Sequence, residues 1–338
     1  MIEFKISAPG KIILFGEHAA VYGRTAVASS INLRTTVKFT ERCRSQYLRN
    51  IIKIEFPDIK LSFSLPFYIF RNHFFSDNFD YPSVKKNNQL HSRVSDFIDL
   101  IKDSTDKSNN EITKEQKLSL QAFFYLFVYI AYEECMNVKE TSLHVHLSTE
   151  LKVGTGLGSS ASFAVCLSAC FLHWSILQKG NQHTTFNKDE LDKISKYALN
   201  CEKIMHESPS GIDNSVCTYG SVIKFQQKKL VDMLPHVLNL KILLVNTNII
   251  RSTKDQVERA ARIKNVYPDI INPILDCIGD VSQNAWEVFT EMNKIVDKAT
   301  EAMEDYWFEK LSVNVICVCG LQYVILLYIF YNIFKTHM

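Results

Sequence analysis

The stretch Gly154-Thr155-Gly156-Leu157-Gly158-Ser159-Ser160-Ala161 places three glycines and two serines directly before a segment of small and apolar residues. An alternating strand pattern, Ser142–Ser148, precedes it, and a predicted helix, Ser159–Gln178, follows it. The backbone N–H groups and the positive end of such a helix point at one place, which favours binding of an anion such as phosphate. Glycines let the backbone approach that ligand closely. The spacing matches neither the P-loop nor the dinucleotide fingerprint, and a glycine turn with a serine N-cap is the plain structural alternative.

Glycine is scarce elsewhere in the chain. The sequence has 11 glycines in 338 residues, about half of the ~7% average usage. Eight of the 11 lie in three short windows. Besides the stretch quoted above, these windows are Ala8–Gly23, with the run Gly16-Glu17-His18, and Glu202–Gly220, with Ser210-Gly211-Ile212-Asp213. A chain that uses glycine so sparingly is expected to place it where the backbone must adopt an unusual conformation.

Composition and charge exclude several classes of protein. The 38 Lys+Arg and 36 Asp+Glu residues leave a formal net charge of +2, too small a basic excess for a polyanion or nucleic-acid binder driven by net charge. The nine cysteines are odd in number and form no Cys-x-x-Cys pair. The first residues, Met1–Gly10, lack the pattern of a secretory signal. Free thiols and a cytoplasmic location are therefore expected.

Hydrophobic periodicity predicts a mixture of strands and helices without strict alternation, which is typical of an α+β fold. Residues 72–115 are expected to be polar and irregular around one helical patch, Ser92–Ile101. The expected strands are Ile2–Ser7, Thr35–Phe39, Ile51–Phe56, Lys60–Leu65, Ser142–Ser148, Val222–Phe225 and Leu240–Val245. The further expected helices are Lys114–Met136, Ser159–Gln178, Asn187–His206, Thr253–Ile263 and Val281–Phe308.

The other two glycine windows have ordinary explanations when each is taken alone. Lys11 interrupts an apolar run and could extend its stem toward water, and Glu17-His18 could form a solvated turn. Turn chemistry accounts for Ser210-Gly211. It does not account for the two acids, Glu202 and Asp213, that accompany this turn.

Taken together and in order, the three windows resemble the small-metabolite kinase superfamily that includes galactokinase, homoserine kinase and mevalonate kinase. Within that superfamily the first window is most similar to the mevalonate kinase family, since galactokinases carry an Arg and an Asn before Gly-Glu-His. The resemblance extends over about residues 5–305, with a divergent stretch at 72–115. It implies a two-domain α+β kinase fold with the active site in the cleft between the domains.

The resemblance also implies roles for individual residues. Asp213 matches the catalytic base and Lys11 the lysine beside it, which keeps the aspartate ionised and also faces the nucleotide. Ser160 and Glu202 match the ligands of Mg²⁺, a cation that prefers oxygen donors. Substrate contacts are implied for Glu17, His18, Asp213 and Thr253, the last beside Arg251 and Ser252 at a helix start that an ordinary N-cap explains equally well. The remaining residues implied in ATP binding are Thr149, Gly154, Thr155, Gly156, Leu157, Gly158, Ser159 and Ser210.

The C-terminal part departs from the family. A glycine-rich segment of the Thr-Gly-Ala-Gly-Gly-Gly-Gly kind is missing, and Leu311–Phe334 contains no charged residue. This stretch is long enough for a membrane span. Three hypotheses compete: a tail anchor, replacement elements in the second domain, or an alternative or wrongly assigned last exon, which the missing segment favours. The expected organisation is a kinase domain at 1–220, an incomplete C-terminal domain at 221–310 and an atypical tail at 311–338.

The expected function is phosphorylation of mevalonate at its 5-hydroxyl with ATP and Mg²⁺, in isoprenoid and sterol precursor synthesis. The alternative is a regulatory relative that binds ATP without turnover, because the C-terminal glycine-rich segment is absent. The expected partners are mevalonate and ATP, without nucleic acid. A homodimer stays open, and membrane contact through 311–334 is not favoured.

Overall fold

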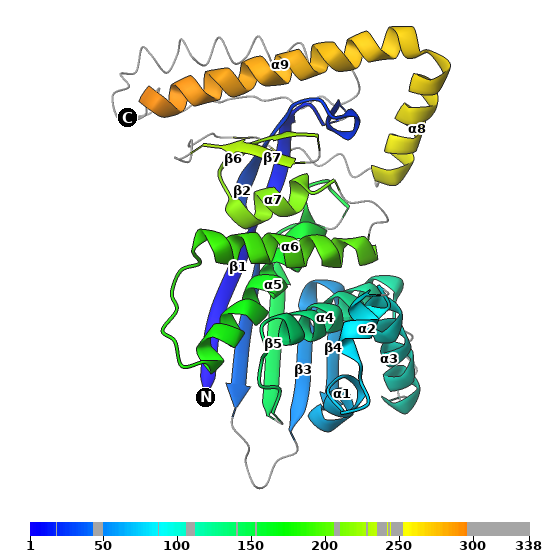
Figure 1. Cartoon of the computed structure of the whole chain (residues 1–338), viewed down its shortest axis with the longest axis vertical. Helices are drawn as coiled ribbons and strands as arrows, with labels where there is room; N and C mark the ends of the chain where they lie inside the picture. Colours follow the sequence, from blue (N-terminus) through cyan, green and yellow to red (C-terminus); the bar gives the residue numbers. More distant parts are fainter. Residues whose placement is uncertain are drawn as a thin grey trace, which may run out of the picture. The chain divides into compact units, whose positions relative to one another are not determined.

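The computed structural model in Figure 1 has strands and helices in mixed order, which confirms the expected α+β class. The chain divides into two compact units: unit 1 holds Met1–Gly10, Asn32–Lys152 and Gly158–Pro209, and unit 2 holds Lys11–Ile31, Val153–Leu157 and Ser210–Met338. The structure describes residues 1–17, 19–42, 50–86, 88–105, 112–139, 141–152, 154–205, 210–227, 229–234, 242, 244 and 253–295.

Unit 1 is built on strands with one buried and one open face. In β3 (Ile51–Phe56), β4 (Leu61–Pro66) and β5 (Ser142–Thr149), buried residues alternate with more exposed ones. This alternation is typical of a sheet with one covered face. β5 pairs antiparallel with β2 (Ala26–Arg42) and parallel with β3, which pairs antiparallel with β4. β1 (Ile2–Phe15) pairs with β2.

Helices cover the buried face of these strands (Figure 1). Phenylalanines from α1, α3 and α4 pack against one another there, as Phe70 does with Phe97 and Phe127. Such aromatic packing supplies much of the apolar burial of the unit. The helices of unit 1 are α1 (Phe67–Phe74), α2 (Tyr81–Lys86), α3 (Leu90–Thr105), α4 (Lys114–Glu133), α5 (Ser159–Gln178) and α6 (Lys188–Met205), with a 3₁₀ turn, η2 (Pro57–Ile59).

Helix α5 is the central helix of unit 1. It packs against both α4 and α6 and is buried almost all round. Within the described part of the chain it is the one helix long and apolar enough to cross a membrane, and 78% of its apolar window is buried in the protein. Burial of this kind indicates a core helix. The tail at 311–334, for which membrane contact was considered, lies outside the described residues.

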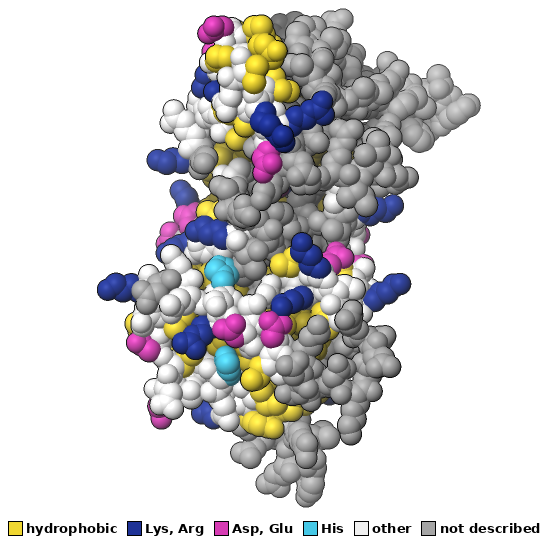
Figure 2. Space-filling model, turned by 90° about the vertical axis from the view of Figure 1, so that its right-hand side faces the viewer, with side chains coloured by type: hydrophobic (Ala, Val, Ile, Leu, Met, Phe, Trp, Pro, Cys, Tyr) yellow, Lys and Arg dark blue, Asp and Glu magenta, His cyan; other side chains and the backbone are white. Residues whose placement is uncertain are grey.

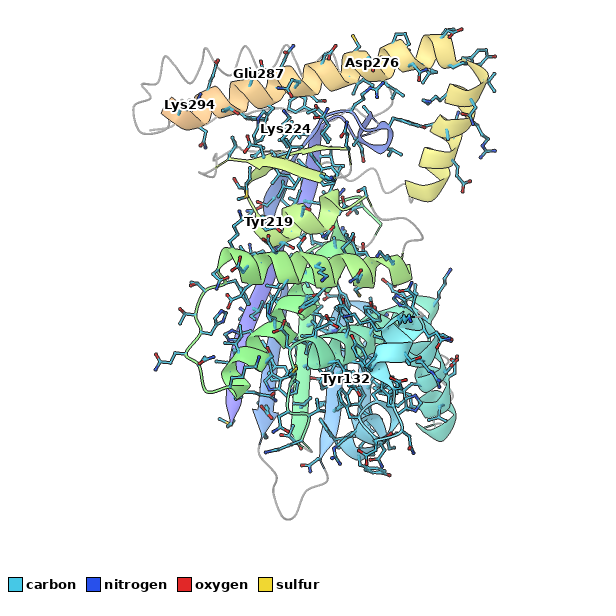
Figure 3. The ribbon with its side chains drawn as sticks, viewed as in Figure 1. Tyr132, Tyr219, Lys224, Asp276, Glu287 and Lys294 are labelled. Atoms are coloured by element: carbon cyan, nitrogen blue, oxygen red, sulfur yellow. The ribbon has the colours of Figure 1, made fainter. Side chains whose placement is uncertain are left out.

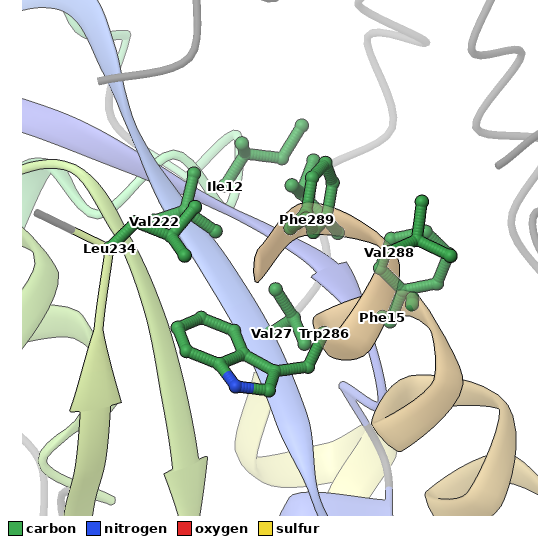
Figure 4. Close-up of a cluster of buried hydrophobic side chains, with 10 residues drawn as sticks. Ile12, Phe15, Val27, Val222, Leu234, Trp286, Val288 and Phe289 are labelled. Carbon is green, nitrogen blue, oxygen red and sulfur yellow. The ribbon is translucent and has the colours of Figure 1, made fainter. Parts of the chain in front are cut away.

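Unit 2 contains the end of β1, the start of β2 and the C-terminal helices. Trp286, Val288 and Phe289 of α9 (Pro268–Ile295) pack on Phe15 and Val27 (Figure 4). A second cluster places α7 (Ile212–Tyr219) on Ala26, Ala28, Ile223 and Phe225. The other elements are η1 (Ala19–Tyr22), β6 (Val222–Gln226), β7 (Lys229–Met233) and α8 (Thr253–Val266).

Several element predictions were wrong in extent. β1 continues to Phe15 through Pro9 and Gly10, which an edge strand tolerates because proline needs no ladder partner there. Residues 72–115 contain α2 and α3 as well as the end of α1, so this stretch is more helical than expected. α9 begins at Pro268 rather than Val281. The predicted strand Leu240–Val245 and the residues after Ile295 lie outside the described residues, except Ile242 and Leu244.

Surface charge agrees with the small net charge of the sequence. On the face shown in Figure 2, Lys and Arg side chains are interspersed with Asp and Glu side chains among the described residues. Mixed charge of this kind is ordinary for a globular protein surface.

Candidate active site

Lys11 and Asp213 form a close pair in unit 2. The Lys11 ammonium lies 3.1 Å from Oδ1 of Asp213, and the lysine is buried while the aspartate is about one-third exposed at 35%. Burial lowers the pKa of Lys11, but the carboxylates of Asp213 and Glu17 and the hydrogen bond with Asp213 raise it by more. The net pKa of Lys11 therefore lies above its ordinary value, and the lysine is a cation at neutral pH.

Local backbone chemistry fixes Asp213 in the first turn of α7. Gly211 has a φ of +86° at the N-cap, a conformation that residues with a Cβ rarely adopt. The Ile212 N–H donates to Oγ of Ser210 at 3.4 Å, and the Ser215 hydroxyl donates to the Gly211 carbonyl at 2.7 Å. These contacts start the helix at one defined residue. Asp213 then lies at the positive end of α7, which stabilises a carboxylate.

The glycine stretch forms an open loop ahead of α5. Gly154, Gly156 and Gly158 have φ values of +78°, +77° and +73°. A Cβ added at Gly154 or Gly156 would meet nothing within 4 Å, so protein packing does not demand these glycines. They are suited instead to a loop whose backbone approaches a ligand.

Hydrogen bonds hold the C-terminal end of this loop in place. The Lys11 N–H donates to the Leu157 carbonyl at 3.0 Å, which ties the loop to β1 beside the buried lysine. The Ser162 N–H donates to the Gly158 carbonyl at 2.8 Å, and the Ser162 hydroxyl donates to the Ala8 carbonyl at 3.0 Å. The first turn of α5 is thereby fixed, and N–H groups in a first turn have no acceptor within their own helix. This arrangement can hold the oxygens of a phosphate.

The substrate-side candidates fall partly within the described structure. Glu17 is exposed, yet its carboxylate acts on Lys11 strongly enough to raise the pKa of that lysine. His18 lies outside the described residues, as do Arg251 and Ser252. Thr253 is the first residue of α8, but its side chain is also outside the description.

The candidate metal ligands, Ser160 and Glu202, both belong to unit 1. Glu202 lies on α6 and is only 3% exposed. A hydroxyl and a carboxylate are hard oxygen donors, and Mg²⁺ typically takes one or two protein oxygens and completes its shell with water and phosphate. No group of three or more His, Cys, Asp or Glu among the described residues could hold a metal. The chemistry of this hydroxyl and this carboxylate suits Mg²⁺, and their binding of the ion stays a prediction.

Thr149 is engaged in local structure at the end of β5. Its hydroxyl lies 2.9 Å from the hydroxyl of Thr35 and accepts a hydrogen bond from the Leu151 N–H at 3.1 Å. The Thr149 N–H donates to Asp58 at 2.7 Å. These contacts account for Thr149 as a strand-end residue, and its contact with a nucleotide stays a prediction.

The Lys11–Asp213 pair has one further neighbour that no sequence motif indicates. Cys217 is buried on α7 and contributes to the raised pKa of Lys11. It stands four residues after Asp213, so both lie on the same face of the helix. That spacing was visible in the sequence, but a single cysteine in an eight-residue helix gives a weak signal.

Three comparisons show what the chain is similar to. The family model for the GHMP kinases N terminal domain matches residues 125–221, which include the glycine loop, Glu202 and Asp213. A mevalonate kinase of Dictyostelium discoideum is 32% identical over 316 residues, covering 89% of this chain and 73% of the relative. A mevalonate kinase of Mus musculus is 33% identical over 293 residues, covering 85% and 70%.

Solved structures agree at the level of the fold. The mevalonate kinase of Methanococcus jannaschii superposes with a TM-score of 0.55 at 18% identity, covering 92% of this chain and 80% of that one. The mevalonate kinase of L. major, solved with R-mevalonate, gives 0.54 at 17% identity, covering 92% and 73%. Both likenesses show a shared fold.

Proposed function

Since the chain belongs to the mevalonate kinase family of GHMP kinases, we propose that it transfers the γ-phosphoryl group of ATP to the 5-hydroxyl of mevalonate. The products are 5-phosphomevalonate, a precursor in isoprenoid and sterol synthesis, and ADP. The observation that carries this proposal is the ion pair between the buried Lys11 and Asp213 at 3.1 Å, with the glycine loop tied to Lys11 through its backbone.

Phosphoryl transfer needs a held triphosphate, an aligned acceptor and a group that takes the acceptor proton. The backbone N–H groups of Gly154–Ser160 would hold the phosphates, with the hydroxyls of Ser159 and Ser210 beside them. A carboxylate oxygen of Asp213 would take the proton of the 5-hydroxyl as the new O–P bond forms and the bond to the ADP oxygen breaks. Lys11, a cation held by its partners, would stabilise the negative charge that develops on the acceptor oxygen.

Ser160 and Glu202 would hold Mg²⁺, which when bound neutralises phosphate charge. Glu17, His18 and Thr253 would contact mevalonate. The Glu202 carboxylate is buried at 3% exposure, and its oxygens are donors of the kind that Mg²⁺ prefers.

ADP release by the purified full chain tests this proposal. Mevalonate, galactose and homoserine are compared as acceptors at equal concentration, with ATP and Mg²⁺ present throughout. We expect saturable ADP formation with mevalonate and little with the other two. Faster turnover of galactose or homoserine would overturn the choice of substrate. ATP binding without ADP release from any acceptor would favour the regulatory relative instead.

A further inference from the structure

The segment from Gly16 to Arg24, described at residues 16, 17 and 19–24, contacts one face of α9. A Cβ at Gly16 would come within 2.8 Å of the Ser282 hydroxyl, so the backbone touches the helix there. At the other end of the segment, the Arg24 stem lies against Gly279, where an added Cβ would be 3.0 Å from the Arg24 Cβ. The two contact points on α9 are three residues apart, which places them on the same face.

Arg24 makes the polar contacts that complete this attachment. Its Nε donates to Oδ1 of Asp276 at 2.5 Å, and its Nη1 donates to the Tyr22 carbonyl at 3.1 Å. Asp276 lies one helical turn before Gly279, on the part of α9 nearer to α8 (Figure 3). From α8, the Lys264 ammonium lies 5.2 Å from the centre of the Tyr22 ring. The Arg24 side chain thus links α9, at Asp276, to the backbone of the segment at Tyr22.

Backbone hydrogen bonds close the segment on itself. The Ala20 N–H donates to the Gly16 carbonyl at 2.9 Å, the Gly23 N–H to Ala20 at 3.1 Å and the Arg24 N–H to Ala19 at 3.2 Å. These bonds join Gly16, Ala19, Ala20, Gly23 and Arg24 to one another between the two contacts with α9. Glu17 lies directly after the first contact, and its carboxylate raises the pKa of Lys11. Because Glu17 belongs to this segment, we expect a shift of the segment to displace its carboxylate.

We propose that Arg24, held by Asp276 over Gly279, is a positioning residue that fixes the segment carrying Glu17 for the acceptor substrate. This inference rests on the proposed function for the identity of the acceptor. In this proposal Arg24 acts through the segment and does not touch the substrate. The Arg24–Asp276 ion pair is partly exposed, with side-chain exposures of 39% and 54%. An exposed ion pair adds little to global stability. Its effect should therefore appear in substrate binding rather than in unfolding.

The chain offers a matched control for this pair. Lys117 and Asp99 in unit 1 form an ion pair at 2.6 Å with exposures of 36% and 56%, nearly the same as those of Arg24 and Asp276. Arg24→Met and Lys117→Met both keep an aliphatic stem and remove the cation. A purely structural role predicts the same small change in Tm and unchanged kinetics for both variants.

The experiment measures KM for mevalonate, KM for ATP, kcat and Tm on the purified full chain. We expect Arg24→Met and Asp276→Asn to raise the KM for mevalonate about fivefold to fiftyfold, because a misplacement of ~1 Å costs up to about 10²-fold. KM for ATP should stay within about twofold, and Arg24→Lys should recover part of the loss, since an ammonium keeps the charge without the fork. Lys117→Met should leave every kinetic constant unchanged.

Gly279→Ala separates positioning from stability. Alanine is the better helix former, so the Tm should not fall, while the new methyl group presses on the Arg24 stem and raises the KM for mevalonate. Exchange of the Ala20, Gly23 and Arg24 amides should be faster in Arg24→Met than in the wild type. An unchanged KM for mevalonate in Arg24→Met, or a change equal to that in Lys117→Met, would overturn the proposal.

Failure of the proposed function gives a different pattern. If the wild type uses galactose or homoserine rather than mevalonate, the same KM comparison is made with that acceptor. If no acceptor is turned over, amide exchange decides alone: faster exchange in Arg24→Met than in Lys117→Met supports the attachment, and equal exchange overturns it.

Discussion

At the scale of single residues, Gly16 shows how closely one backbone position can be constrained. Its φ is +81°, and a Cβ there would lie 2.3 Å from the Thr25 carbonyl oxygen and 2.9 Å from the Ala26 Cα. Both neighbours are backbone atoms of the packed strand region, so neither can move without disturbing β2. Position 16 therefore requires glycine for two reasons: the positive φ, and the lack of room for a Cβ.

Gly16→Ala should therefore destabilise the protein strongly. The left-handed conformation alone costs an alanine about 1–2 kcal/mol, and overpacking adds about 1–3 kcal/mol. Gly180→Ala is the matched control, since its φ is +80° but nothing lies within 4 Å of an added Cβ. Urea unfolding should show a loss in Gly16→Ala that exceeds the loss in Gly180→Ala by at least about 1 kcal/mol. Equal losses would mean that the strand region relaxes around the methyl group.

Asp213→Asn tests the proton acceptor at the same scale. The amide keeps the size of the side chain but cannot take a proton, so the fold should persist while kcat falls about 10²–10⁴-fold. Turnover of mevalonate and the Tm are measured together. Asp232→Asn on β7, an exposed aspartate in the same unit, should keep its activity. Near-full activity of Asp213→Asn would remove Asp213 from the role of base.

At the scale of elements, a histidine pair attaches the loop before α6 to α5. Nδ1 of His173 lies 2.6 Å from Nδ1 of His183, and Nε2 of His183 lies 3.1 Å from Glu190. Glu190 also accepts a hydrogen bond from the Asn187 N–H at 2.8 Å, at the start of α6. A hydrogen bond between two imidazoles needs one of the two nitrogens unprotonated. The attachment therefore requires at least one neutral histidine.

This attachment should weaken in acid. Burial, and then the neighbouring His183, lower the pKa of His173 below 6.5, while Glu190 opposes the shift. A histidine with a lowered pKa stabilises the fold fully above its unfolded pKa, and this stability is lost as the pH falls through and below about 6.5. The Tm should fall from pH 7.5 to 5.5, and His173→Gln should show a smaller fall, since glutamine does not titrate.

Part of that fall should persist in His173→Gln because burial also lowers the pKa of His73 and His91. Ser175→Ala on the same helix removes a buried hydroxyl without a titrating group. It should lower the Tm equally at both pH values. An equal fall in the wild type and in His173→Gln would show that this histidine does not contribute to the acid sensitivity.

The success of prediction from sequence varied with the kind of element. α5 has the predicted bounds, because a glycine loop marks its start and continuous apolar residues mark its length. α7 was not predicted because eight residues are too few to show a helical period. β7 was not predicted because its five residues are mostly exposed and show no apolar alternation. β2 was predicted only at Thr35–Phe39. Its first four residues, Ala26-Val27-Ala28-Ser29, are all buried and do not alternate.

In the candidate site, too, some residues were predictable from the sequence and others were not. Sequence motifs selected Lys11 and Asp213, which the fold places 3.1 Å apart, while their roles in catalysis stay predictions. No motif selected Arg24, Asp276 or Gly279. Their association depends on the packing of α9 against a segment more than 250 residues earlier in the chain. Unlike the Lys11–Asp213 pair, this contact lies in no motif that marks its residues in the sequence.

At the scale of the whole molecule, two strands belong to both units. β1 passes from unit 1 to unit 2 between Gly10 and Lys11, and β2 passes back between Ile31 and Asn32, each without a break in the strand. Loss of structure in one unit therefore releases strand residues that continue into the other. This continuity favours a single cooperative unfolding transition.

Trp286→Ala tests this coupling. Trp286 is buried among Phe15, Val27 and Val222 in unit 2 (Figure 4), so its removal should cost about 3–5 kcal/mol. Trp174 reports on unit 1, where its ring packs on Phe39 and Phe127. In a Trp307→Phe background, Trp174 becomes the remaining tryptophan of the variant. In Trp286→Ala, the urea midpoint from Trp174 fluorescence should be lower than that of the parent chain. It should equal the midpoint that circular dichroism gives for the same variant.

Val231→Ala is the control for this experiment. Val231 is an apolar residue of unit 2 that is 53% exposed, so its replacement should leave the urea midpoint unchanged. In the same Trp307→Phe background, the parent chain gives the reference midpoint from circular dichroism. If Trp174 kept that midpoint in Trp286→Ala, unit 1 would be stable without the packing of unit 2. The shared strands would then connect two independently folding parts, because burial within unit 1 alone would hold β1 and β2 in place.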